Sequence, residues 1–243
     1  MRRLIISVAA LIAALSIDGA ALAGGQMAGG QMPGGMGGQT PGGSPMHPPS
    51  EDTGIASTPS TEKPDVAAKK AFTAGVKSLN RAKEFEAASA SAPNPDKKAK
   101  NLDKANDALN KALDQFTEAL SNKGDMYDAW SDVGYVHLRL GAYAESVDDY
   151  NHALVLKPDN FEAIEYRAEA YLAVDRLEDA KSAYMDLFNH ERNLAEQLMV
   201  AMQKWLANHR SAANGMRPAD IDAFDKWIQE RDGIAKQTAS VPH

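Results

Sequence analysis

Asp125–Pro158 reads DMYDAWSDVGYVHLRLGAYAESVDDYNHALVLKP, and its pattern returns elsewhere in the chain at a spacing of 34 residues. Its first half aligns with the next period at Asp125/Asp159, Tyr127/Phe161, Asp128/Glu162, Ala129/Ala163, Trp130/Ile164, Gly134/Ala168 and Leu138/Leu172. The second half occurs three times, as Ala112, Phe116, Ala119 and Leu120, then Ser146, Tyr150, Ala153 and Leu154, then Ala180, Tyr184, Leu187 and Phe188. A fixed period of this length indicates stacked supersecondary units.

The 34-residue unit resembles the tetratricopeptide repeat, a pair of helices with small and aromatic residues at set positions. The matching positions are Trp130, Val133, Gly134, Ser146, Tyr150, Ala153 and Pro158, and His137 stands where the family usually has Tyr. The resemblance implies an all-α, right-handed helical solenoid of about three helix pairs, followed by a long C-terminal helix and a capping helix. It also implies that the protein binds other proteins.

A longer version of the repeat is expected before this unit, over residues 64–124. Apolar residues at helical spacing follow Pro64, and the APNP stretch at residues 92–95 ends that helix. A second helix is predicted from about Asp96 to Asn122, with Gly75 as the close-packing residue on the first. The next repeats are 125–158 and 159–210, with Gly141 and Asp175 in the turns.

The small and aromatic residues of the repeats are predicted to form the core. Gly134 and Ala168 allow helices to approach closely. The bulky side chains that fill the remaining space, with tyrosine hydroxyls at the solvent edge, are Trp130, Tyr150, Tyr171 and Tyr184. His137 is expected to be a buried, hydrogen-bonded histidine, and Asp148 and Asp149 to lie on a solvated face.

The last repeat lacks the closing proline, because Arg192 stands one period after Pro158. One helix is therefore predicted to continue to about His209, with a kink near Asn189 left open. A capping helix is expected within residues 211–232, with Ile221, Phe224, Trp227 and Ile228 on its apolar face. Residues 233–243 are predicted to be a disordered tail.

Residues 1–23 resemble a cleavable secretory signal, with Arg2 and Arg3 before an apolar run and cleavage expected after Ala23. An uncleaved anchor is the less favoured alternative, because the apolar run is short for a bilayer. Residues 24–63 form a Gly/Met/Pro-rich stretch that is expected to be a disordered linker. These features predict a periplasmic or secreted protein of a bacterial cell envelope, and the chain contains no Cys for disulfides.

The linker contains soft metal ligands, and in this compartment Cu(I) is the ion that such ligands favour. The candidate ligands are Met27, Met32, Met36, Met46 and His47. Their spacing is irregular, so a plain linker is favoured. A periplasmic metal-handling protein that binds Cu(I) here is the alternative function.

Signatures of catalysis are absent from the sequence. It has no nucleophile elbow, no HExxH and no phosphate-binding glycine loop. The histidines are scattered, without the spacing of a helical metal site. A formal net charge of −7 argues against nucleic acid as a partner. The sequence therefore predicts a non-enzymatic protein without a cofactor.

The first helix of each pair is expected, from the resemblance, to line a concave groove that binds a peptide or a helix. The groove residues transferred in this way are Asp128, Ser131, Asp132, Tyr135, Leu138, Glu162, Glu165, Glu169 and Leu172. This acidic set predicts a partner with a basic or amphipathic segment, with Lys or Arg near an apolar anchor. The alternative is that the carboxylates only keep the helices soluble. A homo-oligomer through Leu198, Met202 and Trp205 is also left open.

Overall fold

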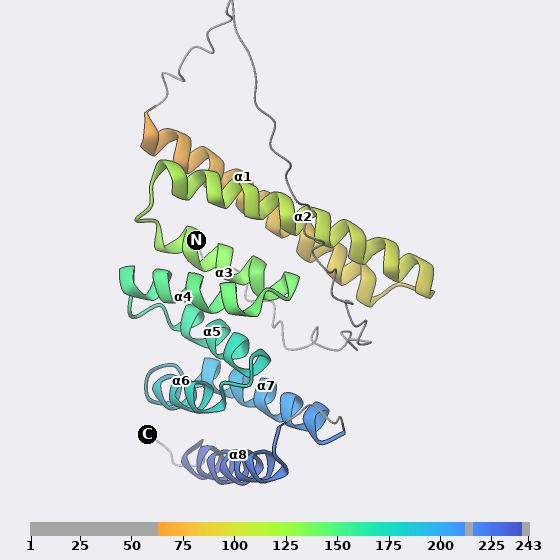
Figure 1. The fold of residues 1–243 in the computed structure, drawn as a ribbon, viewed down its shortest axis with the longest axis vertical. Coiled ribbons are helices and arrows are strands. Elements are labelled where there is room, and N and C mark those ends of the chain that lie inside the picture. Colours follow the sequence, from red (N-terminus) through yellow and green to blue (C-terminus); the bar gives the residue numbers. More distant parts are fainter. Residues whose placement is uncertain (1–62, 212–215, 240–243) are drawn as a thin grey trace, which may run out of the picture. The chain divides into compact units, whose positions relative to one another are not determined.

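The computed structural model describes residues 63–211 and 216–239, and within these ranges every regular element is a helix. Figure 1 shows the helices in chain order. Their bounds are α1 (Pro64–Ala90), α2 (Pro95–Asn122), α3 (Tyr127–Leu140), α4 (Tyr143–Leu156), α5 (Phe161–Ala173), α6 (Leu177–His190), α7 (Arg192–Ser211) and α8 (Pro218–Ala239). The all-α prediction is confirmed.

The first pair is a long hairpin in which α1 and α2 lie side by side (Figure 1). Each helix begins with a proline, whose fixed φ suits the first turn and whose missing N–H would have no partner there. Asn94 caps α2, because its side-chain oxygen accepts a hydrogen bond from the Lys97 N–H at 2.9 Å. The predicted break at residues 92–95 is therefore confirmed.

The next two pairs keep the 34-residue register in space. α3 and α5 begin at Tyr127 and Phe161, and α4 and α6 begin at Tyr143 and Leu177. The turns within these pairs contain the described residues with positive φ, Gly141 at 81° and Asp175 at 59°. Glycine adopts this conformation without strain, and aspartate is among the residues that tolerate it best. Both predicted turn positions are confirmed.

His137 and Asp149 join α3 to α4. The His137 Nδ1 and the Asp149 Oδ2 are 2.6 Å apart, and both side chains are largely shielded from solvent. The prediction of a hydrogen-bonded His137 is confirmed, whereas the placement of Asp149 on a solvated face was wrong. Burial raises the pKa of Asp149, and the bond to His137 opposes that rise.

The prediction of one helix continuing to His209 was wrong. α6 ends at His190, and Glu191 has non-helical backbone (φ −140°, ψ 78°) close to that of Lys157 one period earlier (φ −143°, ψ 85°). The apolar spacing runs through this break, so the sequence pattern does not reveal it. A straight helix from Leu177 to His209 would extend about 50 Å. Folding back buries Leu198 and Met202 completely.

α7 has the 34-residue spacing expected of the first helix of a fourth pair, and α8 is the second helix of that pair. Ile164, Ala168, Tyr171 and Leu172 of α5 are buried, and the residues 34 positions later, Leu198, Met202, Trp205 and Leu206, are buried too. Phe224 and Ile228 of α8 are buried as predicted for a capping helix. The predicted tail begins too early, because α8 continues past Gly233 to Ala239.

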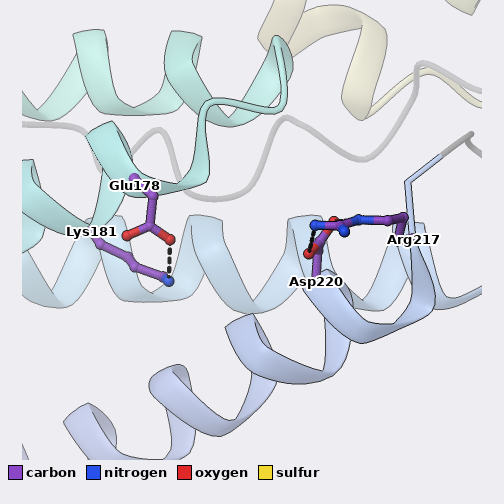
Figure 2. Close-up of polar contacts among 4 residues, drawn as sticks. All are labelled: Glu178, Lys181, Arg217 and Asp220. Atoms are coloured by element: carbon purple, nitrogen blue, oxygen red, sulfur yellow. Dashed lines mark hydrogen bonds and ion pairs between the residues drawn. The ribbon is translucent and has the colours of Figure 1, made fainter.

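Lys181 joins α6 to α8. Its ammonium lies 5.8 Å from the Phe224 ring centroid and 5.9 Å from that of Trp227, and it donates a hydrogen bond to Glu178 at 2.7 Å (Figure 2). Figure 2 also shows Arg217 bonded to Asp220, which orders the first turn of α8. The cap is therefore held by contacts of a lysine with ring faces as well as by apolar packing.

The residues predicted as signal and linker, 1–63, lie outside the described ranges except for Lys63. So do the candidate copper ligands of the linker. Within the described helices, no segment combines the length and apolarity needed to cross a bilayer.

α1 and α2 approach each other closely at Gly75, which confirms its predicted role. A Cβ there would lie 2.5 Å from Phe116 Cε1, and that ring is completely buried. Gly75→Ala is therefore expected to lower the free energy of unfolding by about 1–3 kcal/mol, measured by urea denaturation. Gly233→Ala is the control: nothing lies within 4 Å of its Cβ, and replacing a helical glycine should stabilise by about 0.5–1 kcal/mol. Equal stability of the two variants would contradict this packing.

Candidate functional site

The predicted groove residues do not all lie on an exposed surface. Asp128 and Glu162 are exposed in the first turns of α3 and α5. Ser131 is partly buried and accepts a hydrogen bond from Asn160 Nδ2 at 3.2 Å. Leu172 is only 3% exposed. Leu138 is partly buried and packs against the apolar core. Both leucines are therefore packing residues, and their part in a partner-binding groove stays a prediction.

The other predicted residues converge beside the core. Tyr135 and Glu165 are buried, and Asp132 and Glu169 are partly buried. We call Glu165 and Glu169 the carboxyl pair; they lie one turn apart on α5 and their side chains are hydrogen-bonded to each other. Two carboxyl groups can form this bond only when one of them holds a proton.

Burial dominates the chemistry of the carboxyl pair. It raises the pKa of Glu165 to about 9, and the neighbouring charges of Glu169 and Glu162 add to the rise. It raises the pKa of Glu169 to about 7, where the positive charges of Arg139 and Lys204 oppose it. Burial and the repulsion between the two carboxyls therefore favour a pair that shares a proton.

Positive charges reach the pair from two other helices. Arg139 of α3 donates to Glu86 Oε1 of α1 through Nε at 3.0 Å and through Nη2 at 2.8 Å. Lys204 comes from α7, and burial lowers its pKa while the charge of Glu169 raises it. Thus α1, α3, α5 and α7, the first helices of four pairs, each contribute a charged residue to one cluster.

Three tyrosine rings border the carboxyl pair. Tyr135 meets Tyr166 edge to face with ring centroids 5.2 Å apart, and Tyr150 stacks on Tyr166 at 6.4 Å. Lys83 of α1 lies 4.7 Å from the Tyr135 centroid. Burial raises the pKa of all three phenols, that of Tyr135 to about 12. They remain neutral hydroxyls at physiological pH.

Tyr150 has a hydroxyl with unusual surroundings. The ring is buried against Gly134, and its oxygen has no hydrogen-bond partner among the described residues. This differs from the prediction that its hydroxyl reaches solvent. The groups that act on it electrostatically are Tyr166, Tyr135, Glu169 and Glu165. A buried polar group without a partner costs stability, so this one requires an explanation.

Sequence reasoning missed four members of this cluster, Glu86, Arg139, Tyr166 and Lys204. Glu86 had a detectable signal, because it lies one turn after Ala82 and two turns after Leu79 on the buried stripe of α1. A charged residue in a core position of a helix is a candidate for a buried ion pair. The other three depend on helix contacts that a single sequence does not show.

A metal site is not found among the described residues: no three His, Asp or Glu side chains are grouped to hold an ion. The cluster combines carboxyls, hydroxyls and cations without such a group. It is suited to hydrogen bonding and charge recognition.

The chain matches no family model and no curated protein. Among solved structures it is similar to the TPR domain of Arabidopsis OM64, with 17% sequence identity and a TM-score of 0.40. The match covers 57% of this chain and 98% of that domain. The description of the fold rests on this chain's own helix pairs and their 34-residue register.

Proposed function

We propose that this protein is a non-catalytic protein-binding module, an adaptor or assembly factor, that recognises a segment of a partner through the first helices of its pairs. The observation that carries this proposal is the cluster around the carboxyl pair. Four helices from four pairs bring Glu86, Arg139, Glu169 and Lys204 close enough to act on one another electrostatically.

The cluster is costly for the fold, and this supports a role in recognition. Burying carboxyls and cations lowers stability unless each is well paired, and Glu165 has only other carboxyls among the charges that act on it. Perturbed ionisable groups gather at functional sites more often than elsewhere. The exposed carboxylates of Asp128 and Glu162 lie in the first turns of α3 and α5, where they favour the approach of a basic segment.

The proposed setting is a bacterial cell envelope. Its support is the sequence of residues 1–23, with a basic start, an apolar run and small residues before Ala23. In this setting the module would hold an exported partner during assembly.

A site-specific crosslinking experiment tests the proposed function. A photoreactive benzoylphenylalanine is placed at Asp128 or Glu162, both exposed on first helices, and at Asp148, exposed on α4, as the control. We expect crosslinks to the same protein from the first two positions and none to it from Asp148. Crosslinks of equal yield from all three positions, or from Asp148 alone, would contradict binding through the first helices.

A further inference from the structure

The last turn of α4 exposes two apolar side chains side by side. Val155 is 81% exposed, more than any other large apolar side chain among the described residues, and Leu156 is 43% exposed. Apolar side chains that are exposed singly are common on protein surfaces, whereas neighbouring ones can mark a binding surface. The surroundings of these two residues therefore decide what they mean.

The repeat itself shows that the fold does not need apolar residues at these two positions. α2, α4 and α6 end at equivalent positions, 34 residues apart. All the equivalents of Val155 and Leu156 are polar and exposed, and they are Ser121 and Asn122 in α2 and Asn189 and His190 in α6. The apolar end of α4 is therefore a feature of this helix pair and not a requirement of the repeat.

Trp130 of α3 lies against the last turns of α4 and is fixed by two contacts. Its ring stacks on that of His152 with the centroids 4.5 Å apart, and its indole N–H donates to the Gly124 carbonyl at 2.9 Å. His152 lies three residues before Val155, so the two are neighbours on one face of α4. The indole is only partly buried. It therefore offers a pre-formed aromatic surface next to the exposed end of α4.

Tyr127, one turn before this indole, extends the surface across the first turn of α3. The ammonium of Lys157 is 5.8 Å from its ring centroid. The register places Tyr127 beside Leu156, because their equivalents in the next pair, Phe161 and His190, stack with ring centroids 5.4 Å apart. We call the following four residues the α3–α4 patch: Tyr127, Trp130, Val155 and Leu156.

The surroundings of the α3–α4 patch are acidic. Asp125 and Asp128 lie at the start of α3, and both are exposed. The lysines of the two flanking turns are each paired with an aspartate, Lys123 with Asp65 at 3.3 Å and Lys157 with Asp159 at 2.6 Å. These pairs leave Asp125 and Asp128 as the excess charge beside the patch. Excess negative charge attracts Lys or Arg and repels an acidic segment.

We propose that the α3–α4 patch binds an apolar side chain of the partner, within a segment in which Lys or Arg flanks that side chain. This inference rests on the proposed function, because it assigns the part of the partner that α3 recognises. The apolar side chain covers Val155 and Leu156, and the basic side chain lies toward Asp125 and Asp128. A second copy of the chain fits less well, because joining two such patches would bring their acidic surroundings together.

The test uses the peptide acetyl-Lys-Leu-Leu-Lys-amide as the probe. NMR follows the methyl groups of Val155 and Leu156 and the indole N–H of Trp130. Control peptides carry Glu in place of Lys, or Ser in place of Leu. We expect saturable shifts of all three signals, and binding of each control that is weaker by about tenfold or more. Equal binding of either control peptide, or shifts only at signals outside the patch, would overturn the proposal.

A double variant taken from the repeat removes the apolar part of the patch. Val155→Ser/Leu156→Asn gives α4 the two residues that already end α2, so it is expected to unfold at the same urea concentration as the wild type. It should bind the lysine peptide about tenfold more weakly. Val200→Ser is the matched control, because Val200 is 47% exposed on α7, outside the patch. Undiminished binding in the double variant, or equal weakening in the control, contradicts the assignment.

The two proposals can fail separately. If the lysine peptide binds the patch but the crosslinks at Asp128 and Glu162 find no common protein, the patch stands and the protein-binding function fails. If a partner is crosslinked from both positions with a yield that Val155→Ser/Leu156→Asn does not lower, the function stands and the patch assignment is wrong. A dimer that this double variant dissociates, measured by analytical ultracentrifugation, would identify a second copy as the occupant and overturn the proposal.

Discussion

Glu165→Gln is expected to stabilise the protein at neutral pH, although it alters a buried, hydrogen-bonded residue. In the folded chain Glu165 is 4% exposed and its pKa is raised to about 9 from an ordinary value of 4.5. At pH 7 the unfolded carboxyl is ionised and well hydrated, whereas folding requires it to take up a proton. Gln needs no proton and keeps a donor for Glu169, so the gain is of the order of 2–3 kcal/mol.

The direction of the pH dependence follows from the same shift. Between the unfolded pKa of 4.5 and the folded pKa of about 9, the folded state binds more protons than the unfolded state. The free energy of unfolding of the wild type should therefore fall as pH rises through this window. The stability that protonation contributes is fully present below the unfolded pKa and is lost as pH approaches the folded one.

Urea denaturation at pH 5, 7 and 8.5 checks this expectation. The difference between Glu165→Gln and the wild type should be small at pH 5 and grow toward pH 8.5. Glu145→Gln, on an exposed site, is the control and should follow the wild type at all three values. A variant that is less stable than the wild type at pH 8.5, or a difference that does not change with pH, would show that Glu165 is ionised in the folded protein.

The pairing of helices could be predicted from the sequence because its determinants are local and repeated. Phe116, Tyr150 and Tyr184 recur every 34 residues and all three are buried. Phe116 packs against Gly75, and Tyr150 packs against Gly134. The break at Glu191 could not be predicted in the same way. There the apolar spacing is continuous, and the position of the break depends on whether α5 and α6 offer a surface for α7.

The candidate site was predicted only in part. The family resemblance placed Tyr135, Glu165 and Glu169 on one face, and the structure brings them together. It did not show that Glu165 is buried, because the burial of a helix face depends on contacts between separate pairs, such as that of α3 with α5. The predicted face is therefore less acidic than the count of its carboxylates suggests, since burial raises the pKa of Glu165 and Glu169.

Replacing either residue of the Glu86–Arg139 ion pair with an apolar one is expected to lower the free energy of unfolding by about 3 kcal/mol, because the remaining charge stays shielded from solvent without its partner. The side chains are only 11% and 16% exposed, and the pair joins α1 to α3. Glu86→Leu and Arg139→Met are each destabilising on this argument, with Glu86→Leu the worse of the two because Arg139 cannot lose its charge.

The double variant Glu86→Leu/Arg139→Met should regain most of that loss, since it removes both buried charges and leaves apolar side chains of similar length. Urea denaturation of the four proteins in a double-mutant cycle measures the coupling. Additivity within about 0.5 kcal/mol would show that the two residues act independently. Strong coupling together with an altered pH dependence in Arg139→Met would further show that Arg139 holds down the pKa of Glu169, as its position implies.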